Sequence, residues 1–196
     1  MSKIDSKALI KTLEEQLSQI NQEFEQIVKE HDADFLRHKP GKKQWSAIEC
    51  IQHLYLTNKY YLPKLEKALS KAQQAVATPK DIYKPGFFGN YLYKSMKPVN
   101  GEITKKVGTF GSINPDKKYA QTTLDVEKVC ANFRKQQTEI KKLLVLAEEV
   151  GLDNGRVPSL IGPIMSFKPG DVFRFLLAHE ERHLIQAKNA IPQTIA

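Results

Sequence analysis

The sequence predicts an all-α protein, a four-helix bundle with long crossover connections, on three observations. Four segments repeat apolar residues every three or four positions, and two irregular segments rich in Gly and Pro interrupt them. No Gly-rich phosphate-binding loop follows a strand pattern. Apolar spacing of this kind forms one stripe along a helix, and such stripes are buried against other helices. Because 196 residues make about one ordinary domain, we expect a single domain over residues 1–196.

The first two helices have clear signals. Residues 5–30 form the first, with its apolar stripe at Ile10, Leu13, Leu17, Ile20, Phe24 and Ile27, and residues 31–44 read as a connecting loop. Ser46 and Glu49 then fit a capping box, with Trp45 placed to pack against the first turn. This pattern predicts a second helix that runs to about Ala72.

The segment 73–122 breaks the helical rhythm. It contains Gly, Pro, Asn and many aromatic residues, so it is too aromatic for a flexible linker and too long for a simple connection. We expect an ordered crossover with one or two short helical turns, which could also cover the mouth of a site.

The last two helices follow on either side of a second irregular stretch. Apolar residues from Val126 predict a third helix that ends at Gly151, a residue typical of helix C-termini. Asp171 is predicted to be the N-cap of a fourth helix that ends near Asn189.

Composition excludes several classes of protein. No apolar run is long enough to span a bilayer, and the first residues lack the pattern of a signal peptide, so we expect a cytoplasmic protein without a membrane partner. The formal net charge is +8, but the lysines are spread along helical faces beside glutamates, which favours a solvated surface over a nucleic-acid site. Cys50 and Cys130 lie in apolar segments and are expected to be buried, reduced thiols.

The fourth helix carries the pair His179 and His183. Residues four apart lie on one face of a helix, so both rings can reach one metal ion. At about 100° per residue, the pair falls on the apolar stripe with Val172, Phe175, Leu176 and Gln186. Buried imidazoles need partners, and ligation of a metal by neutral rings supplies one. The alternative is a pair of core or partly exposed histidines that bond to carboxylates.

The same five residues match H-E-x-x-H, the zinc protease motif, but the context excludes that class. Gln186 and Asn189 stand where the metzincin extension needs Gly and His, and only 13 residues follow His183. A third ligand must therefore come from upstream, where His31, His38 and His53 are the candidates. His31 and His38 lie where exposed histidines are common, whereas His53 lies in the middle of the second helix. By helical phase, His53 is about 140° from that helix's apolar stripe, so either the helix is buried on two sides or His53 is exposed.

Two groups of residues resemble the DinB-like (YfiT-type) superfamily, whose members are described as metal-dependent hydrolases. The first is Trp45-Ser46-Ala47-Ile48-Glu49 with Ile51-Gln52-His53-Leu54, and the second is Gly162-Pro163 with Ala178-His179-Glu180-Glu181-Arg182-His183-Leu184-Ile185-Gln186. The resemblance covers essentially the whole chain, although the segment 73–122 is longer and more aromatic than in short members. It implies a four-helix bundle with His53, His179 and His183 as ligands of one divalent metal ion. Nickel and zinc are the favoured metals, and iron and manganese are the alternatives.

Four other residues are candidates for the site. Glu49 is placed to orient His53 or act as a base, although its capping role explains it as well. Glu180 lies about 100° from the histidine stripe, so we expect a surface position, with support of the ligands as the alternative. Gln186 lies on the ligand face and either bonds a ligand or fills polar core space. Tyr60 either lines a pocket or packs in the core.

These features favour a metal-dependent enzyme acting on a small molecule. The resemblance implies two chemistries, hydrolysis and transfer of a low-molecular-weight thiol, and three His ligands leave positions open for either. The alternative is a non-catalytic bundle that binds a ligand or partner in the same place. A homodimer through a spare helical face, such as that of the first helix, is a further expectation.

Overall fold

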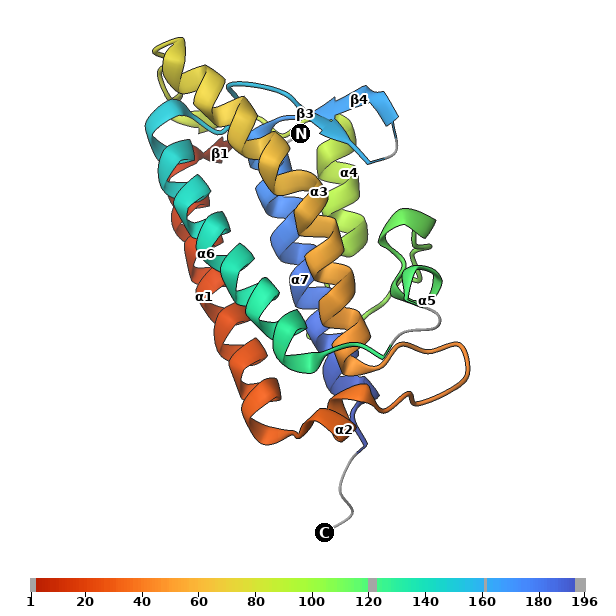
Figure 1. The fold of residues 1–196 in the computed structure, drawn as a ribbon. Coiled ribbons are helices and arrows are strands. Elements are labelled where there is room, and N and C mark those ends of the chain that lie inside the picture. Colours follow the sequence, from red (N-terminus) through yellow and green to blue (C-terminus); the bar gives the residue numbers. More distant parts are fainter. Residues whose placement is uncertain (1–2, 120–122, 161, 193–196) are drawn as a thin grey trace.

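The computed structural model describes residues 3–119, 123–160 and 162–192. Four long helices form a bundle in this part of the chain (Figure 1): α1 (Ser6–Glu30), α3 (Ala47–Gln74), α6 (Val126–Val150) and α7 (Pro169–Ala190). Helix α3 packs most extensively on α6 and α7, and α1 packs on α6 and α7. The all-α fold class is thus confirmed. None of the described helices combines the length and apolar character that crossing a membrane requires.

Three of the four long helices begin at a residue whose side chain caps the helix. The Asp5 side chain accepts a hydrogen bond from the Ala8 amide at the start of α1, and Asp125 does the same for α6. The predicted capping box is present at α3, where Ser46 N–H donates to Glu49 at 2.8 Å and the Glu49 amide donates to Ser46 Oγ at 3.3 Å. Helix α6 ends at Gly151, whose φ of 95° suits glycine.

The connection between α1 and α3 contains a short helix, α2 (Ala33–Arg37), where a loop was expected. Asp32 caps it by accepting from the Asp34 and Phe35 amides, and Leu36 is buried. Five residues are too few to show a helical period, so the sequence pattern could not predict this helix. Its buried residue, Leu36, packs on the bundle.

The crossover between α3 and α6 contains more helix than the one or two turns expected. It holds β2 (Ile82–Tyr83), α4 (Phe87–Met96), the 3₁₀ turn η1 (Gly111–Ile113) and α5 (Pro115–Lys118). Strand β2 pairs antiparallel with β1 (Ile4–Asp5), with Ile4 opposite Tyr83. Helix α4 packs along α7, with η1 and α5 beside α3 (Figure 1).

The second irregular stretch forms a small hairpin before α7. Strand β3 (Val157–Ser159) pairs antiparallel with β4 (Gly162–Phe167), and the register shifts between Pro158 and Ser159. The prediction that Asp171 caps α7 is wrong, because the helix begins at Pro169 and its N-cap is Lys168. Asp171 instead accepts from the Gly86 amide at 2.9 Å and so binds the start of α4.

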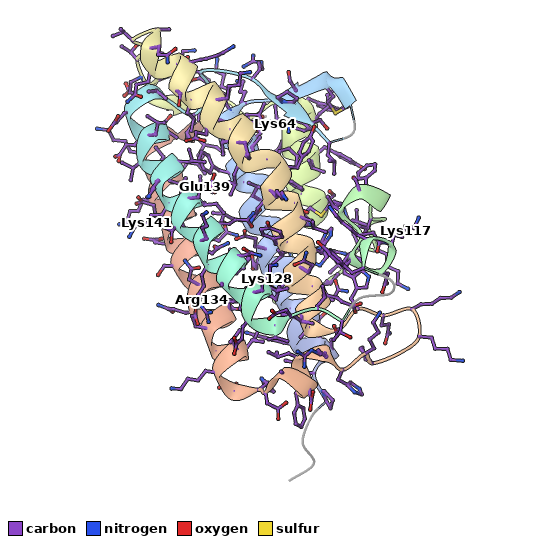
Figure 2. The ribbon with its side chains drawn as sticks, in the orientation of Figure 1. Lys64, Lys117, Lys128, Arg134, Glu139 and Lys141 are labelled. Atoms are coloured by element: carbon purple, nitrogen blue, oxygen red, sulfur yellow. The ribbon has the colours of Figure 1, made fainter. Side chains whose placement is uncertain are left out.

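Charged side chains lie on the outside of the bundle. Lys128 and Lys141 on α6 are exposed and point away from the core (Figure 2). Most of the described buried side chains are apolar, but polar ones gather in the three-histidine cluster and in a second cluster around Glu180, and Asp171, Arg174 and Arg182 of α7 are buried as well.

Candidate metal centre

Helix α7 brings His179 and His183 onto one face, one turn apart. Their ring centroids are 4.5 Å apart, and the residues are only 4% and 7% exposed. Phe175, one turn before His179, stacks on the His179 ring at 5.4 Å. The pair therefore replaces core residues, as the apolar stripe predicted.

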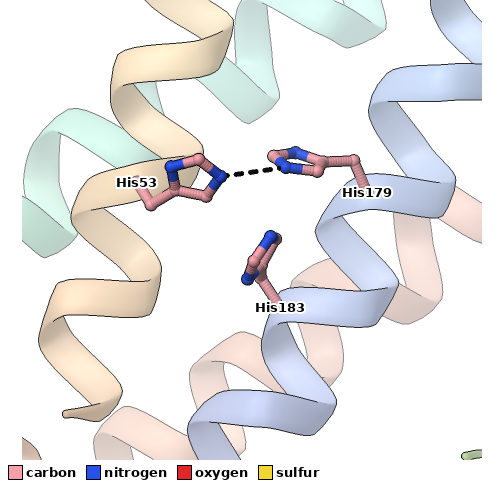
Figure 3. A group of neighbouring side chains, drawn as sticks. All are labelled: His53, His179 and His183. Atoms are coloured by element: carbon pink, nitrogen blue, oxygen red, sulfur yellow. Dashed lines mark hydrogen bonds between the residues drawn. The ribbon is translucent and has the colours of Figure 1, made fainter. Parts of the chain in front are cut away.

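Helix α3 supplies the third ring from across the bundle. His53 is 2% exposed, and its ring centroid lies 4.9 Å from that of His179 and 4.6 Å from that of His183. The three side chains converge from two helices (Figure 3). Of the two positions that helical phase left open for His53, the structure has the buried one, because α3 is covered on one side by α6 and on another by α7 and the crossover.

The three rings fit a divalent metal ion. Each offers a nitrogen, and these atoms all lie within 4.8 Å of one another. The Nε2 atoms of His53 and His179 are 3.0 Å apart. Two nitrogens that each lie about 2.1 Å from one ion, at a right angle, are separated by about 3.0 Å. The rings thus stand at the spacing of two ligands of one ion.

A backbone carbonyl fixes the orientation of His53. Its Nδ1 lies 2.7 Å from the carbonyl oxygen of Ile113 in η1. A carbonyl only accepts, so Nδ1 carries the proton and the lone pair of Nε2 faces the other two rings. Nδ1 of His179 and Nδ1 of His183 have no hydrogen-bond partner among the described residues. Sequence reasoning missed the role of Ile113, since no local pattern reports a carbonyl that lies 60 residues away.

Burial keeps all three rings neutral. It lowers the pKa of His53 to about 4, against the opposing effect of the bond to Ile113. Burial, followed by the charges of the neighbouring rings and of Arg182, holds the pKa values of His179 and His183 well below their usual range. Neutral imidazole is the form that binds metals, so the fold keeps these side chains ready to bind at neutral pH.

An indole covers one side of the cluster. The Trp45 ring lies 4.9 Å from that of His53 and 5.9 Å from that of His183. Its Nε1 donates to Asp116 in α5 at 2.8 Å, and Lys39 also binds Asp116, at 2.6 Å. Sequence reasoning gave Trp45 only a packing role at the start of α3, whereas the structure also places it against the candidate ligands.

The surface position expected for Glu180 is wrong, because the residue is 0% exposed. Its Oε1 accepts from Asn58 Nδ2 at 2.7 Å and from Gln137 Nε2 at 3.0 Å, which links α7 to α3 and α6. Burial raises the pKa of Glu180 to about 7 against the effect of these two amides. The helical phase was correct, but the face 100° from the histidines also points into the bundle because three helices surround α7.

The remaining candidates lie at varying distances from the cluster. Glu49 forms the capping box and an ion pair with Lys39 at 2.8 Å, so its carboxylate does not orient His53. The Tyr60 hydroxyl donates to the Ser159 carbonyl at 2.8 Å, which directs it to the β3–β4 hairpin instead of the histidines. Gln186 is partly buried and lies one turn after His183 in α7. Its side chain favours the charged form of the His183 ring.

The other expected ligand candidates and the thiols take no part in the cluster. His31 Nδ1 lies 3.0 Å from the Ile27 carbonyl at the end of α1, and His38 is exposed at the end of α2. Cys50 and Cys130 are buried free thiols, as predicted. Burial raises the pKa of both, that of Cys130 to about 11, so they stay protonated and unreactive at neutral pH.

The fold and the cluster together define a four-helix bundle with a candidate three-histidine metal centre between its second and fourth long helices. The chain belongs to the DinB superfamily, whose family model matches residues 16–187. This range contains all three histidines and the capping box of α3. No curated protein and no solved structure matches the chain significantly.

Proposed function

We propose that this protein is a metal-dependent enzyme that acts on a small molecule, either as a hydrolase or as a transferase of a low-molecular-weight thiol. One observation carries the proposal: three buried, neutral imidazoles converge from two helices, with no Asp, Glu or Cys in the group. Three nitrogen ligands are typical of catalytic metal sites, because structural zinc sites use four protein ligands. Nickel and zinc are the metals that we favour, with iron and manganese as alternatives.

The chain's own residues hold the metal and exclude water around it. His53, His179 and His183 would bind the ion, with the Ile113 carbonyl orienting the first of these rings. When bound, a divalent ion at such a site lowers the pKa of a water or a thiol and polarises an acceptor group. Trp45 and Phe175 provide apolar walls that strengthen electrostatic interactions with a reacting group.

Metal content of the purified protein tests the metal site. The protein is purified without metal-affinity chromatography, and the His179→Ala variant is compared with wild type by elemental analysis. We expect about one divalent ion per chain in wild type and a loss of most of it in the variant. His38→Ala is the matched control, since His38 is exposed outside the cluster and its loss should leave the metal content unchanged. Equal metal content in wild type and His179→Ala would contradict the proposal.

A screen of thiols, esters and amides with the nickel, zinc, iron and manganese forms tests catalysis separately. Turnover that depends on the added metal and fails in His179→Ala supports the enzyme. Tight binding of a small molecule without turnover of any substrate supports the alternative, a non-catalytic binding bundle.

A further inference from the structure

Arg182 lies inside the H-x₃-H segment, on the side of the ligand face of α7. At about 100° per residue it stands about 60° from His179, on the side opposite Glu180. Its Nη2 donates to the carbonyl oxygen of Lys105 in the crossover. The side chain therefore extends from α7 toward the segment that covers the histidines.

The guanidinium of Arg182 is buried without a countercharge. The residue is 6% exposed, and the described residues offer it no Asp or Glu partner. The acceptor that the described residues provide is a neutral backbone carbonyl, that of Lys105. Burying a charge without a partner is costly, and a guanidinium has five N–H donors to satisfy. What Arg182 lacks among the described residues is therefore a countercharge.

Arg174, the other buried arginine of α7, has a different environment. It lies 3.8 Å from the Asp171 carboxylate, donates to Asn90 at 3.1 Å and stacks over the Tyr93 ring at 4.1 Å. These contacts explain Arg174 as an anchor for α4. Arg182, two turns further along the helix, has neither a carboxylate nor a stacked ring among the described residues.

The charge of Arg182 acts on the metal centre. Arg182 directly precedes His183 in α7, so its charge lies beside the candidate ligands. A divalent ion on three neutral rings adds two positive charges beside it. No carboxylate of the described residues pairs with Arg182 here, while the Glu180 carboxyl lies on the other side of α7 and is bonded to Asn58 and Gln137.

We propose that Arg182 binds a carboxylate of the substrate while the reacting group of the same molecule occupies the metal centre. This inference rests on the proposed function and names its substrate class, small molecules with one carboxylate close to a thiol or a hydrolysable group. A carboxylate accepts stronger hydrogen bonds from a guanidinium than the Lys105 carbonyl does, and it matches the planar fork of donors. A single guanidinium suits the single charge of a carboxylate.

Ligand binding to the cobalt(II)-loaded protein tests this assignment without turnover. Binding of a thiol to cobalt changes its visible absorption, so titrations give dissociation constants for 3-mercaptopropionate and for its neutral analogue 3-mercaptopropionamide. We expect wild type to bind the carboxylate about tenfold or more tightly than the amide. In Arg182→Gln this preference should disappear, and in Arg182→Lys it should be reduced but present.

Lys106→Gln is the matched control, because Lys106 is an exposed cation in the same covering segment and its loss changes the net charge equally. It should keep the wild-type preference. Equal affinity of wild type for the two thiols, or a preference that survives in Arg182→Gln, would overturn the inference and leave the metal centre intact. Stronger competition by inorganic phosphate than by acetate would overturn the assignment to a carboxylate. A protein that binds no cobalt would instead overturn the proposed function, and the inference with it.

Discussion

His53 Nδ1 donates to the carbonyl oxygen of Ile113 at 2.7 Å, so a ring on α3 is oriented by the backbone of the crossover. This bond selects the tautomer in which Nε2 faces His179 and His183. The crossover is therefore part of the candidate metal centre, and its position affects the ligands directly. The predictions below follow from this arrangement and from the contacts around it.

Trp45 should report metal binding by its fluorescence. It is the chain's single tryptophan, and its ring lies 4.9 Å from that of His53. Titration with nickel or cobalt is expected to quench most of the emission, since both ions quench at short range. Trp45→Phe should bind the same amount of metal by elemental analysis and give no signal. Full emission from protein that demonstrably holds one nickel per chain would show that the ion binds elsewhere.

Acid should destabilise the metal-free protein. The pKa of His53 is about 4 in the folded chain against 6.5 for the free side chain, and those of His179 and His183 are also lowered. The unfolded chain therefore takes up protons that the folded chain does not, and the free energy of unfolding falls as the pH drops from about 6.5 toward 4. The shift of His53 alone corresponds to about 3 kcal/mol over this range.

Denaturant unfolding of the metal-free protein at several pH values measures this effect. His53→Leu should show a shallower dependence on pH, because it lacks one of the three titrating rings. Loaded protein should also lose its metal over the same range, since protons compete with the ion for the rings. Unfolding that does not respond to pH between 7 and 4 would be inconsistent with buried neutral histidines.

Replacing Glu180 by Ala should destabilise the protein more than replacing it by Gln. Glu180→Ala leaves the amides of Asn58 and Gln137 unpaired, at about 1–3 kcal/mol for each. Glu180→Gln keeps an acceptor and should cost much less. Urea unfolding at pH 7 compares the two, and an equal loss in both variants would argue against the hydrogen bonds.

The same carboxyl predicts a second pH effect of opposite sign. A folded pKa of about 7 means that the folded chain holds a proton that the unfolded chain releases above about pH 4.5, so this group lowers stability as the pH rises toward 7. Glu180→Gln should therefore gain stability with rising pH more steeply than wild type between pH 4.5 and 7. A slope identical to that of wild type would place the carboxyl in an environment with an ordinary pKa.

Asp116 should hold the crossover over the cluster. It accepts from Trp45 and Lys39, and its side chain is 39% exposed. Because exposed ion pairs contribute about 1 kcal/mol or less, Asp116→Ala should change global stability little. It should speed hydrogen exchange in residues 111–119 and the transfer of metal to a chelator. Glu23→Ala, which removes an ion pair with Lys188 elsewhere, is the control and should affect neither rate.

Gly89 allows α4 to approach α7. A Cβ at this position would collide with Cβ and Cγ of Asp171, so either the Asp171 side chain or α4 must shift. Gly89→Ala should destabilise the protein by about 1–3 kcal/mol. Gly108→Ala is the control, since a Cβ there meets nothing within 4 Å. Thermal unfolding compares the two variants, and equal melting temperatures would show that α4 adjusts freely.

Local sequence determined the helices and one half of the metal centre. The apolar period placed α1, α3, α6 and α7 to within a few residues, because burial of a helical stripe acts at every turn. The capping box at Ser46 was readable for the same reason, since its partners lie three residues apart. Spacing and phase also put His179 and His183 on one buried face.

Only the tertiary structure decided what meets that face. The phase of His53 left its position open, and the packing of α3 between α6, α7 and the crossover buried it. Asp171 and Glu180 were both misplaced from sequence, because each serves a partner more than 40 residues away: Gly86 for the first, Asn58 and Gln137 for the second. A helix's own sequence reports its period and its ends, whereas the number of neighbours that surround it depends on the path of the whole chain.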